Sequence, residues 1–358
     1  MNDLTLGLAV LGGTMLAALV AWNTWTARRN TPRQPEESDT TPMPPPSSAD
    51  AAAAARPGLV GDHDGDRREP VLDDVGLEPV PPPERKPGLD ALIDVIAPVA
   101  LDAVVSGDAA LAAMPPTRRA GSKPFAVEGC NEKTGTWETP QPGQRYTAFQ
   151  TGVQLANRSG ALNEIEFSEF VMKAQAFADA IGGTPDFPEM RHEVARAREL
   201  DQFASGHDAQ LSLTLRARQA AWSPGYVQQH AARLGFVAGV IPGRMVLPSP
   251  LPGSPPLLVL SFDTQAALAE DPTQAALREL TLSVDVPQVP RGDQPFVRMR
   301  EAAAALGQSM DGVLTDDRGQ VIRSEALDSI GADLESLYET LEARDLAAGS
   351  PQARRLFS

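Results

Sequence analysis

The chain has 358 residues and a formal net charge of −16, and its 33 prolines are about twice the usual share of about 5%. The length allows about two domains, and the excess of proline indicates that part of the chain is linker. The acidity disfavours a nucleic-acid binder, because such a protein needs a basic face to displace counterions from phosphates. The single cysteine, Cys130, excludes an intramolecular disulfide and a zinc site built from cysteines.

An uncharged apolar segment lies near the N-terminus. Residues 4–27 contain no charge and no proline, and about 20 apolar residues span a bilayer core as a helix. Arg28, Arg29 and Arg33 follow this segment, so the positive-inside rule places the short N-terminus in the periplasm and the rest of the chain in the cytoplasm. We therefore predict an uncleaved transmembrane anchor over residues 1–29 of a single-pass protein of the inner membrane.

Small residues recur every four positions along this predicted span. They are Ala9, Gly13, Ala17 and Ala21. Such a stripe lets two membrane helices approach closely, but chance spacing is the better explanation because alanine and glycine are common in membrane spans. Self-association through the span therefore stays an open alternative.

Residues 30–88 have a different composition. They combine proline, serine, alanine and scattered charge, and this leaves too little apolar surface to offset the entropy of ordering. We predict a disordered Pro/Ala-rich linker. At up to about 3.1 Å per residue, its polyproline II bias would hold a following domain on the order of 100 Å from the membrane.

From residue 89 onward, the hydrophobic periodicity predicts alternating strands and helices. Residues 89–206 form a first α/β unit, whose most distinct element is an amphipathic helix over 163–181 closed by Gly182. Residues 207–346 form a second α/β unit that ends in a long helix, and residues 347–358 remain as a C-terminal tail. The expected fold class is α+β, with an antiparallel sheet backed by helices in a split β-α-β arrangement.

The order of elements in the second unit repeats that of the first. In this alignment Phe170 and Met172 occupy the places of Phe296 and Met299. Two tandem copies would explain the repeat, but any β-α-β-β chain resembles itself to some degree. The duplication is therefore a hypothesis.

Catalytic motifs are missing from the sequence. The four histidines have no metal-binding spacing, and no nucleophile elbow, Walker loop or dinucleotide fingerprint occurs. Cys130 alone is more simply a packed thiol than a nucleophile. We predict a binding protein that is not an enzyme and uses no cofactor and no metal.

One segment resembles a known family. The sequence PFVRMREAAAALGQSMDGVLTDD over 295–317 resembles the ZipA family of bacterial division proteins, with Thr315 as an extra residue. The matching residues are Phe296, Met299, Gly312, Val313, Leu314, Asp316 and Asp317. The layout of periplasmic N-terminus, single span, Pro-rich linker and cytoplasmic α/β domain is similar too.

The resemblance implies a function and a site. In that family a shallow apolar cavity on the open face of an antiparallel sheet takes the C-terminal tail of FtsZ and ties FtsZ filaments to the inner membrane at the division site. By position, the implied contacts are Ile241, Gly243, Leu258, Leu260, Phe262, Thr281 and Ser283. The family has a large aromatic residue where Ser283 falls, and its familiar members carry one such domain.

Other functions stay open at this point. A membrane-anchored division protein that binds the envelope or peptidoglycan would need its folded part outside the cytoplasm, which the arginines after the span disfavour. An RNA-binding module on a similar sheet would need stacking aromatics, whereas the strands here are aliphatic.

Overall fold

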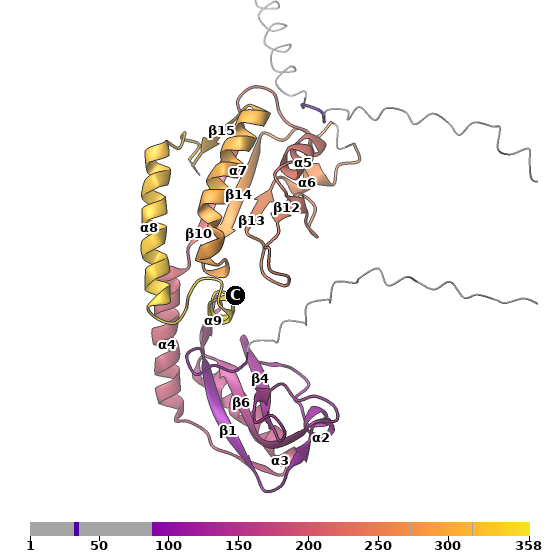
Figure 1. Ribbon diagram of the computed structural model, residues 1–358, viewed down its shortest axis with the longest axis vertical. Coiled ribbons are helices and arrows are strands. Elements are labelled where there is room, and N and C mark those ends of the chain that lie inside the picture. The colour runs from indigo at the N-terminus through magenta and orange to yellow at the C-terminus, as the bar shows by residue number, and fades with distance from the viewer. Residues whose placement is uncertain (1–31, 36–87, 272–273, 317) are drawn as a thin grey trace, which may run out of the picture. The chain divides into compact units, whose positions relative to one another are not determined.

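The computed structural model describes residues 32–35, 88–271, 274–316 and 318–358 (Figure 1). The predicted span and residues 36–87 of the predicted linker lie outside these ranges. No helix within them is long and apolar enough to cross a membrane. The described residues form two large antiparallel sheets with helices, and this arrangement confirms the expected α+β class.

The first unit is built on a sheet with the strand order β3-β4-β6-β1-β9. Its elements in chain order are β1 (Asp94–Leu101), β2 (Val105–Ser106), α2 (Gly107–Ala112), β3 (Arg119–Ala120), β4 (Lys123–Asn131), β5 (Trp137–Glu138), β6 (Arg145–Gln154), β7 (Ala156–Asn157), β8 (Gly160–Ala161), α3 (Glu164–Ile181), β9 (Gly183–Pro185) and α4 (Met190–His207).

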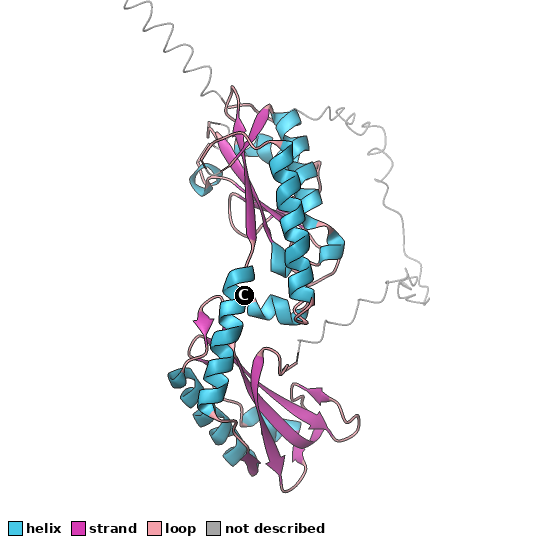
Figure 2. Cartoon of the chain, turned by 90° about the vertical axis from the view of Figure 1, so that its left-hand side faces the viewer, coloured by secondary structure: helices cyan, strands magenta, loops and turns pink. Residues whose placement is uncertain are grey.

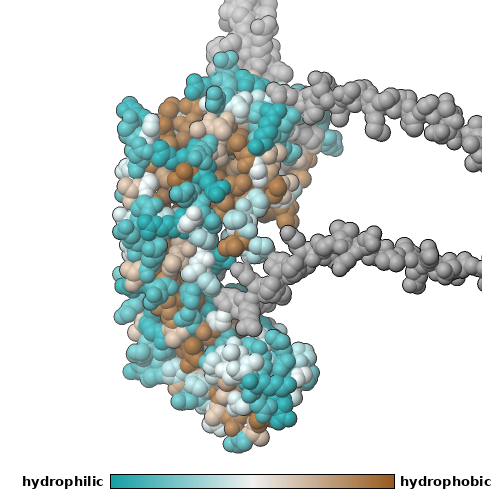
Figure 3. Space-filling model, viewed as in Figure 1, coloured by the Kyte–Doolittle hydropathy of each residue, from teal (hydrophilic) through white to brown (hydrophobic). Residues whose placement is uncertain are grey.

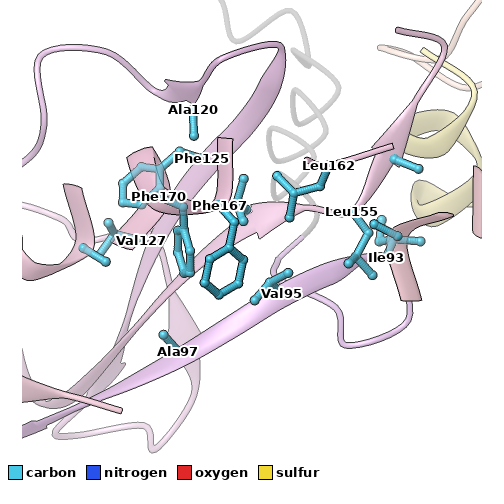
Figure 4. Packing of buried hydrophobic residues seen from close by; sticks show 14 of the residues in the cluster. Ile93, Val95, Ala97, Ala120, Phe125, Val127, Leu155, Leu162, Phe167 and Phe170 are labelled. Carbon is cyan, nitrogen blue, oxygen red and sulfur yellow. The ribbon is translucent and has the colours of Figure 1, made fainter. Parts of the chain in front are cut away.

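Helix α3 carries most of the packing against this sheet. A capping box between Asn163 and Glu166 starts the helix, and Gly182 ends it in the left-handed conformation at φ 69°. Phe167 and Phe170 are buried, with ring centroids 5.8 Å apart, and Phe125 of β4 lies 6.1 Å from Phe170 (Figure 4). The predicted amphipathic helix is therefore confirmed, and its aromatic stripe forms the centre of the first core.

The second unit is built on a sheet with the strand order β11-β12-β13-β14-β10-β15. Its elements, followed by the C-terminal helix α9, are β10 (Gln210–Ala217), α5 (Pro224–Ala232), β11 (Val237–Ala238), β12 (Arg244–Leu247), β13 (Leu258–Ser261), α6 (Thr264–Ala267), β14 (Glu279–Asp285), α7 (Pro295–Met310), β15 (Gly312–Thr315), α8 (Ser324–Glu342) and α9 (Pro351–Leu356).

The second sheet is covered by helices on one face. Strands β10, β13 and β14 alternate, so that Leu213, Leu260 and Leu282 are buried under α5 and α7, whereas their chain neighbours point to the other face. Figure 2 shows the long helices of this unit on one side of its strands. The other face is left for solvent or a partner.

The two units share one connectivity. In each, the first strand lies between the last long strand before the long helix (β6 or β14) and the short strand that follows the helix (β9 or β15), and all these pairings are antiparallel. The register at the short strand also agrees, because Leu101 faces Gly183 and Ala217 faces Gly312. Strands β3 and β4 take the places that β12 and β13 take in the second unit.

This correspondence corrects the alignment of the two long helices. Counted back from the left-handed residue that ends each helix, Phe167 and Phe170 take the places of Phe296 and Met299. Met172 is 65% exposed, so it has no counterpart among the buried residues of α7. The sequence alignment was two to three residues out because it matched residue types and ignored the helix ends.

The last twelve residues are not a free tail. Helix α9 is capped by the Ser350 side chain, and Ala353, Leu356 and Phe357 are at most 1% exposed in the first core. Arg355 adds a bidentate pair with the buried carboxylate of Asp94 on β1, at 2.5 and 2.8 Å. Residues 347–358 therefore belong to the first core although they follow the second unit.

Two glycines at the shared register position provide a stability test. A Cβ placed on Gly183 lies 2.7 Å from Val99 Cγ1, and one placed on Gly312 lies 2.8 Å from Leu215 Cγ. We expect Gly183→Ala and Gly312→Ala each to cost about 1–3 kcal/mol of unfolding free energy, because the buried neighbour cannot withdraw. Gly206→Ala on α4 is the matched control, since an added Cβ there meets nothing within 4 Å. Urea unfolding measures all three, and equal stability of the three variants would contradict the shared packing.

Candidate binding face of the second sheet

The face of the second sheet that the helices leave open carries two rows of side chains. The strand register places Val246, Val259, Ser283 and Ser212 in the first row, from β12 to β10. It places Arg244, Ser261, Thr281 and Thr214 in the second row. These eight residues are half-buried or exposed, and we call them the open face.

A groove of about 540 Å³ lies at one end of the open face. Ser212, Val259 and Ser283 of the first row line it together with Arg244. Its remaining walls come from the loop before β13, from Gln288 and from the C-terminal residues Phe357 and Ser358. The groove therefore offers an apolar floor at Val259 beside hydroxyl and amide groups that donate and accept hydrogen bonds.

Three of the seven residues that the sequence assigned to the site lie in the core. Leu258 and Leu260 are fully buried and Phe262 is 7% exposed, and all three pack with the helices of the second unit. Their neighbours Val259 and Ser261 point to the open face instead. We therefore remove the side chains of Leu258, Leu260 and Phe262 from the candidate site.

Two further residues lie in the turn between β11 and β12. Ile241 is 53% exposed, and Gly243 adopts a left-handed conformation at φ 78°. A Cβ on Gly243 would lie 2.7 Å from the carbonyl oxygen of Phe262, so glycine is required there by close packing as well as by the backbone angle. Neither residue lines the groove described above.

Thr281 and Ser283 are the two assigned residues that lie on the open face. They alternate with the buried Leu280, Leu282 and Val284 along β14, as the sequence pattern predicted. Ser283 also lines the groove. The structure thus brings Thr281 and Ser283 together with Val259, Ser261 and Arg244, which the sequence analysis missed.

Two arginines give the groove its electrostatic character. Arg158, from the β7–β8 hairpin of the first unit, donates four hydrogen bonds of 2.6–2.8 Å to the carboxylates of Asp208 and Asp285. The hydrogen bonds with Asp208, which have the largest effect, and those with Asp285 raise the pKa of Arg158. Arg244 is exposed and forms no ion pair with any residue in the described part of the chain. An acidic group that enters the groove could therefore pair with the positive charge of Arg244.

A larger cavity of about 600 Å³ lies between α7 and α8, on the helix side of the unit. The arginines at its edge are already paired, Arg291 with Glu335 at 2.5 Å and Arg300 with Asp328 at 2.8 Å. Its charges are thus neutralised within the chain, whereas the groove keeps Arg244 unpaired. We therefore take the groove as the better candidate for a specific site.

Exposed apolar side chains do not mark an alternative surface on their own. Five large apolar residues are more than 60% exposed: Ile165 and Met172 both lie on α3, whereas Val240, Leu268 and Val321 lie in three separate connecting segments of the second unit. In the view of Figure 3, hydrophobic and hydrophilic residues are interspersed over the surface. Within the described ranges, no group of three or more His, Cys, Asp or Glu side chains is arranged to hold a metal ion.

No family model matches the chain, and no curated protein matches it.

The reassignment of Phe262 can be tested by stability. We expect Phe262→Ala to cost about 3–5 kcal/mol of unfolding free energy, because it removes a buried aromatic ring from the second core. Ser261→Ala, one residue away on the open face, should change it by less than about 0.5 kcal/mol. Thermal and urea unfolding of the two variants measure the difference. If the Phe262→Ala variant is as stable as the unmodified chain, the assignment of this side chain to the core is wrong.

Proposed function

We propose that this chain is a bacterial cell division protein that binds the C-terminal tail of FtsZ through the open face of its second sheet. In this proposal the predicted span ties the FtsZ ring to the cytoplasmic membrane at the division site. The observation that carries the proposal is the groove on the sheet face that the described helices α5 and α7 leave open. The resemblance of residues 295–317 to the ZipA family supplies the partner.

The architecture of the second unit supports this role. The resemblance implies an antiparallel sheet backed by helices, and the second unit has a six-stranded antiparallel sheet with its long helices on one face. The resembling segment forms α7 and β15, which fix the sheet from behind and at its edge. These elements therefore position the binding face and do not form it.

The open face suits a short peptide with mixed contacts. Val246 and Val259 offer an apolar strip, and the serine and threonine hydroxyls beside it satisfy polar groups of a bound chain. Arg244 adds one positive charge for an acidic side chain of the peptide. This face is more polar than the cavity of the family, in agreement with the serine at position 283.

The first unit has a place in the same proposal. Its shared connectivity and register support the hypothesis that the two units are tandem copies. In this reading the first unit is a second copy of the sheet. Its β7–β8 hairpin carries Arg158, and helix α9, which packs in the first core, is followed by Phe357; both residues line the groove. The first unit therefore acts on binding through Arg158 and Phe357.

A matched pair of substitutions tests the binding face. In the full chain, held in lipid nanodiscs, Val259→Asp places a charge on the apolar strip, and we expect about thirtyfold weaker binding of a synthetic FtsZ tail peptide, corresponding to about 2 kcal/mol. Val297→Asp on α7 is the control, because Val297 is 46% exposed on the helix side. Fluorescence anisotropy gives both affinities.

The outcomes separate the site from the partner. Equal weakening by both substitutions, or by neither, would remove the open face from the proposal. A lack of binding by the unmodified chain would count against FtsZ itself. Melting temperatures of the two variants show whether the comparison is made on folded protein.

The alternative is a membrane-anchored division protein that binds the envelope or peptidoglycan. The hydroxyl-rich open face gives it some support, because serine and threonine side chains both donate and accept hydrogen bonds.

Topology distinguishes the two functions. Because Arg28, Arg29 and Arg33 follow the predicted span, we expect a reporter fused after Ser358 to be active in its cytoplasmic form and silent in its periplasmic form. Activity of the periplasmic reporter would favour the envelope-binding protein instead.

A further inference from the structure

Residues 32–35 lie against the second unit, although the sequence assigns them to the linker. Arg33 pairs with residues 221–223 in a parallel β-bridge, in which its amide donates to the Ala221 carbonyl at 2.7 Å and its carbonyl accepts from the Ser223 amide at 2.9 Å. The side chain of Pro35 reaches Gly225 in the first turn of α5, where a Cβ placed on the glycine lies 3.0 Å from Pro35 Cγ. We call residues 32–35 the docking segment.

The Arg33 side chain compensates negative charge at the C-terminal end of α7. Its guanidinium donates to the carbonyl of Met310 and to the carboxylate of Asp311, both at 3.1 Å. The carbonyl end of a helix is negative, and Asp311 adds a further negative charge there. The last turn of α7 contains no basic residue of its own, so Arg33 provides the compensating charge from a distant part of the chain.

The surface that receives the docking segment belongs to the second core. Trp222 is fully buried, donates from Nε1 to the same Met310 carbonyl at 2.8 Å, and exchanges two backbone hydrogen bonds of 2.8 Å with Leu277 on its other side. The strand edge at 221–223 is thus fixed by the core whether or not Arg33 is present. A fixed edge binds an extended segment without first paying an ordering cost.

We propose that the docking segment is an intramolecular latch that holds the second unit next to the end of the membrane anchor. Arg33 follows Ala27, the last residue of the predicted span, by six residues, which reach at most about 20 Å when fully extended. While the latch is closed, the distance of the second unit from the membrane is set by these few residues. The distance of the second unit from the membrane depends on the predicted span being correct. The contact between the docking segment and the second unit does not depend on it.

The latch changes the role of the linker. Pro35 and Gly88 both adjoin the same folded part of the chain, so residues 36–87 join two of its points while Arg33 is docked. The length of the linker then determines how far the folded part of the chain extends from the membrane only after the docking segment is released. The chain therefore has a membrane-proximal state and an extended state, and Arg33 selects between them.

Thiol trapping in the full chain tests the latch. In a Cys130→Ser background, Pro35→Cys with Gly225→Cys joins the docking segment to α5, and Pro35→Cys with Gly206→Cys is the control pair on α4. Under mild oxidation in nanodiscs we expect the first pair to form its disulfide at least about tenfold faster, because only this pair is held in contact. Mass spectrometry after alkylation counts the free thiols.

Charge reversal tests the part played by Arg33. We expect Arg33→Glu to slow the first pair about tenfold, since two charge-assisted hydrogen bonds are lost and a negative charge meets Asp311. Arg33→Gln should have a smaller effect, because it removes the charge without reversing it. Equal rates for the two thiol pairs would overturn the proposal, as would a first pair that Arg33→Glu leaves unchanged. The measurement uses no FtsZ, so it fails or succeeds independently of the proposed function.

Discussion

The alternation of buried leucines with outward-facing residues on β10, β13 and β14 of the second sheet is the constraint on which the rest of this unit depends. On β14, the side chains of Leu280, Leu282 and Val284 point to the helices. A shift of the strand register by one residue would expose all three side chains to solvent. The same register forces Thr281 and Ser283 outward. The helices α5 and α7 can therefore cover one face only, and the open face with its groove follows from the core.

The open face ends where the two units meet. Arg158 of the first unit pairs with Asp208 and Asp285 at the ends of β10 and β14, and α9 brings the C-terminal residues to the same place. A planar guanidinium between two carboxylates fixes orientation as well as distance, because both pairs are bidentate. The first unit thus shapes the groove even though the strands of the open face all belong to the second.

Much of this fold could be predicted from the sequence. The long helices carry their own end signals, such as the capping box at Asn163 and the serine and proline that open α5, so their positions follow from local chemistry. Helix α9 could not be predicted, because its burial depends on residues of the first unit that lie far away along the chain. The Arg33 contact was missed for the same reason, since Met310 and Asp311 are distant in sequence.

The site was predicted less well than the fold, and the cause is specific. Thr281 and Ser283 were placed by alternation and lie on the open face, whereas Leu258, Leu260 and Phe262 were placed by resemblance alone and lie in the core. Alternation applied to β13 would have selected Val259 and Ser261 instead. Arg244 had no signal in the sequence, because its value depends on having no carboxylate partner among the residues that the structure describes.

The central claim is that a partner contacts the open face of the second sheet, and site-specific photocrosslinking in dividing cells tests it most directly. A photoreactive residue at Ser283 lies on the open face and in the groove, and one at Val297 lies on the helix side as the control. The account predicts an adduct with FtsZ from position 283 and none from position 297. An adduct from position 297 alone, or from neither position, would contradict it.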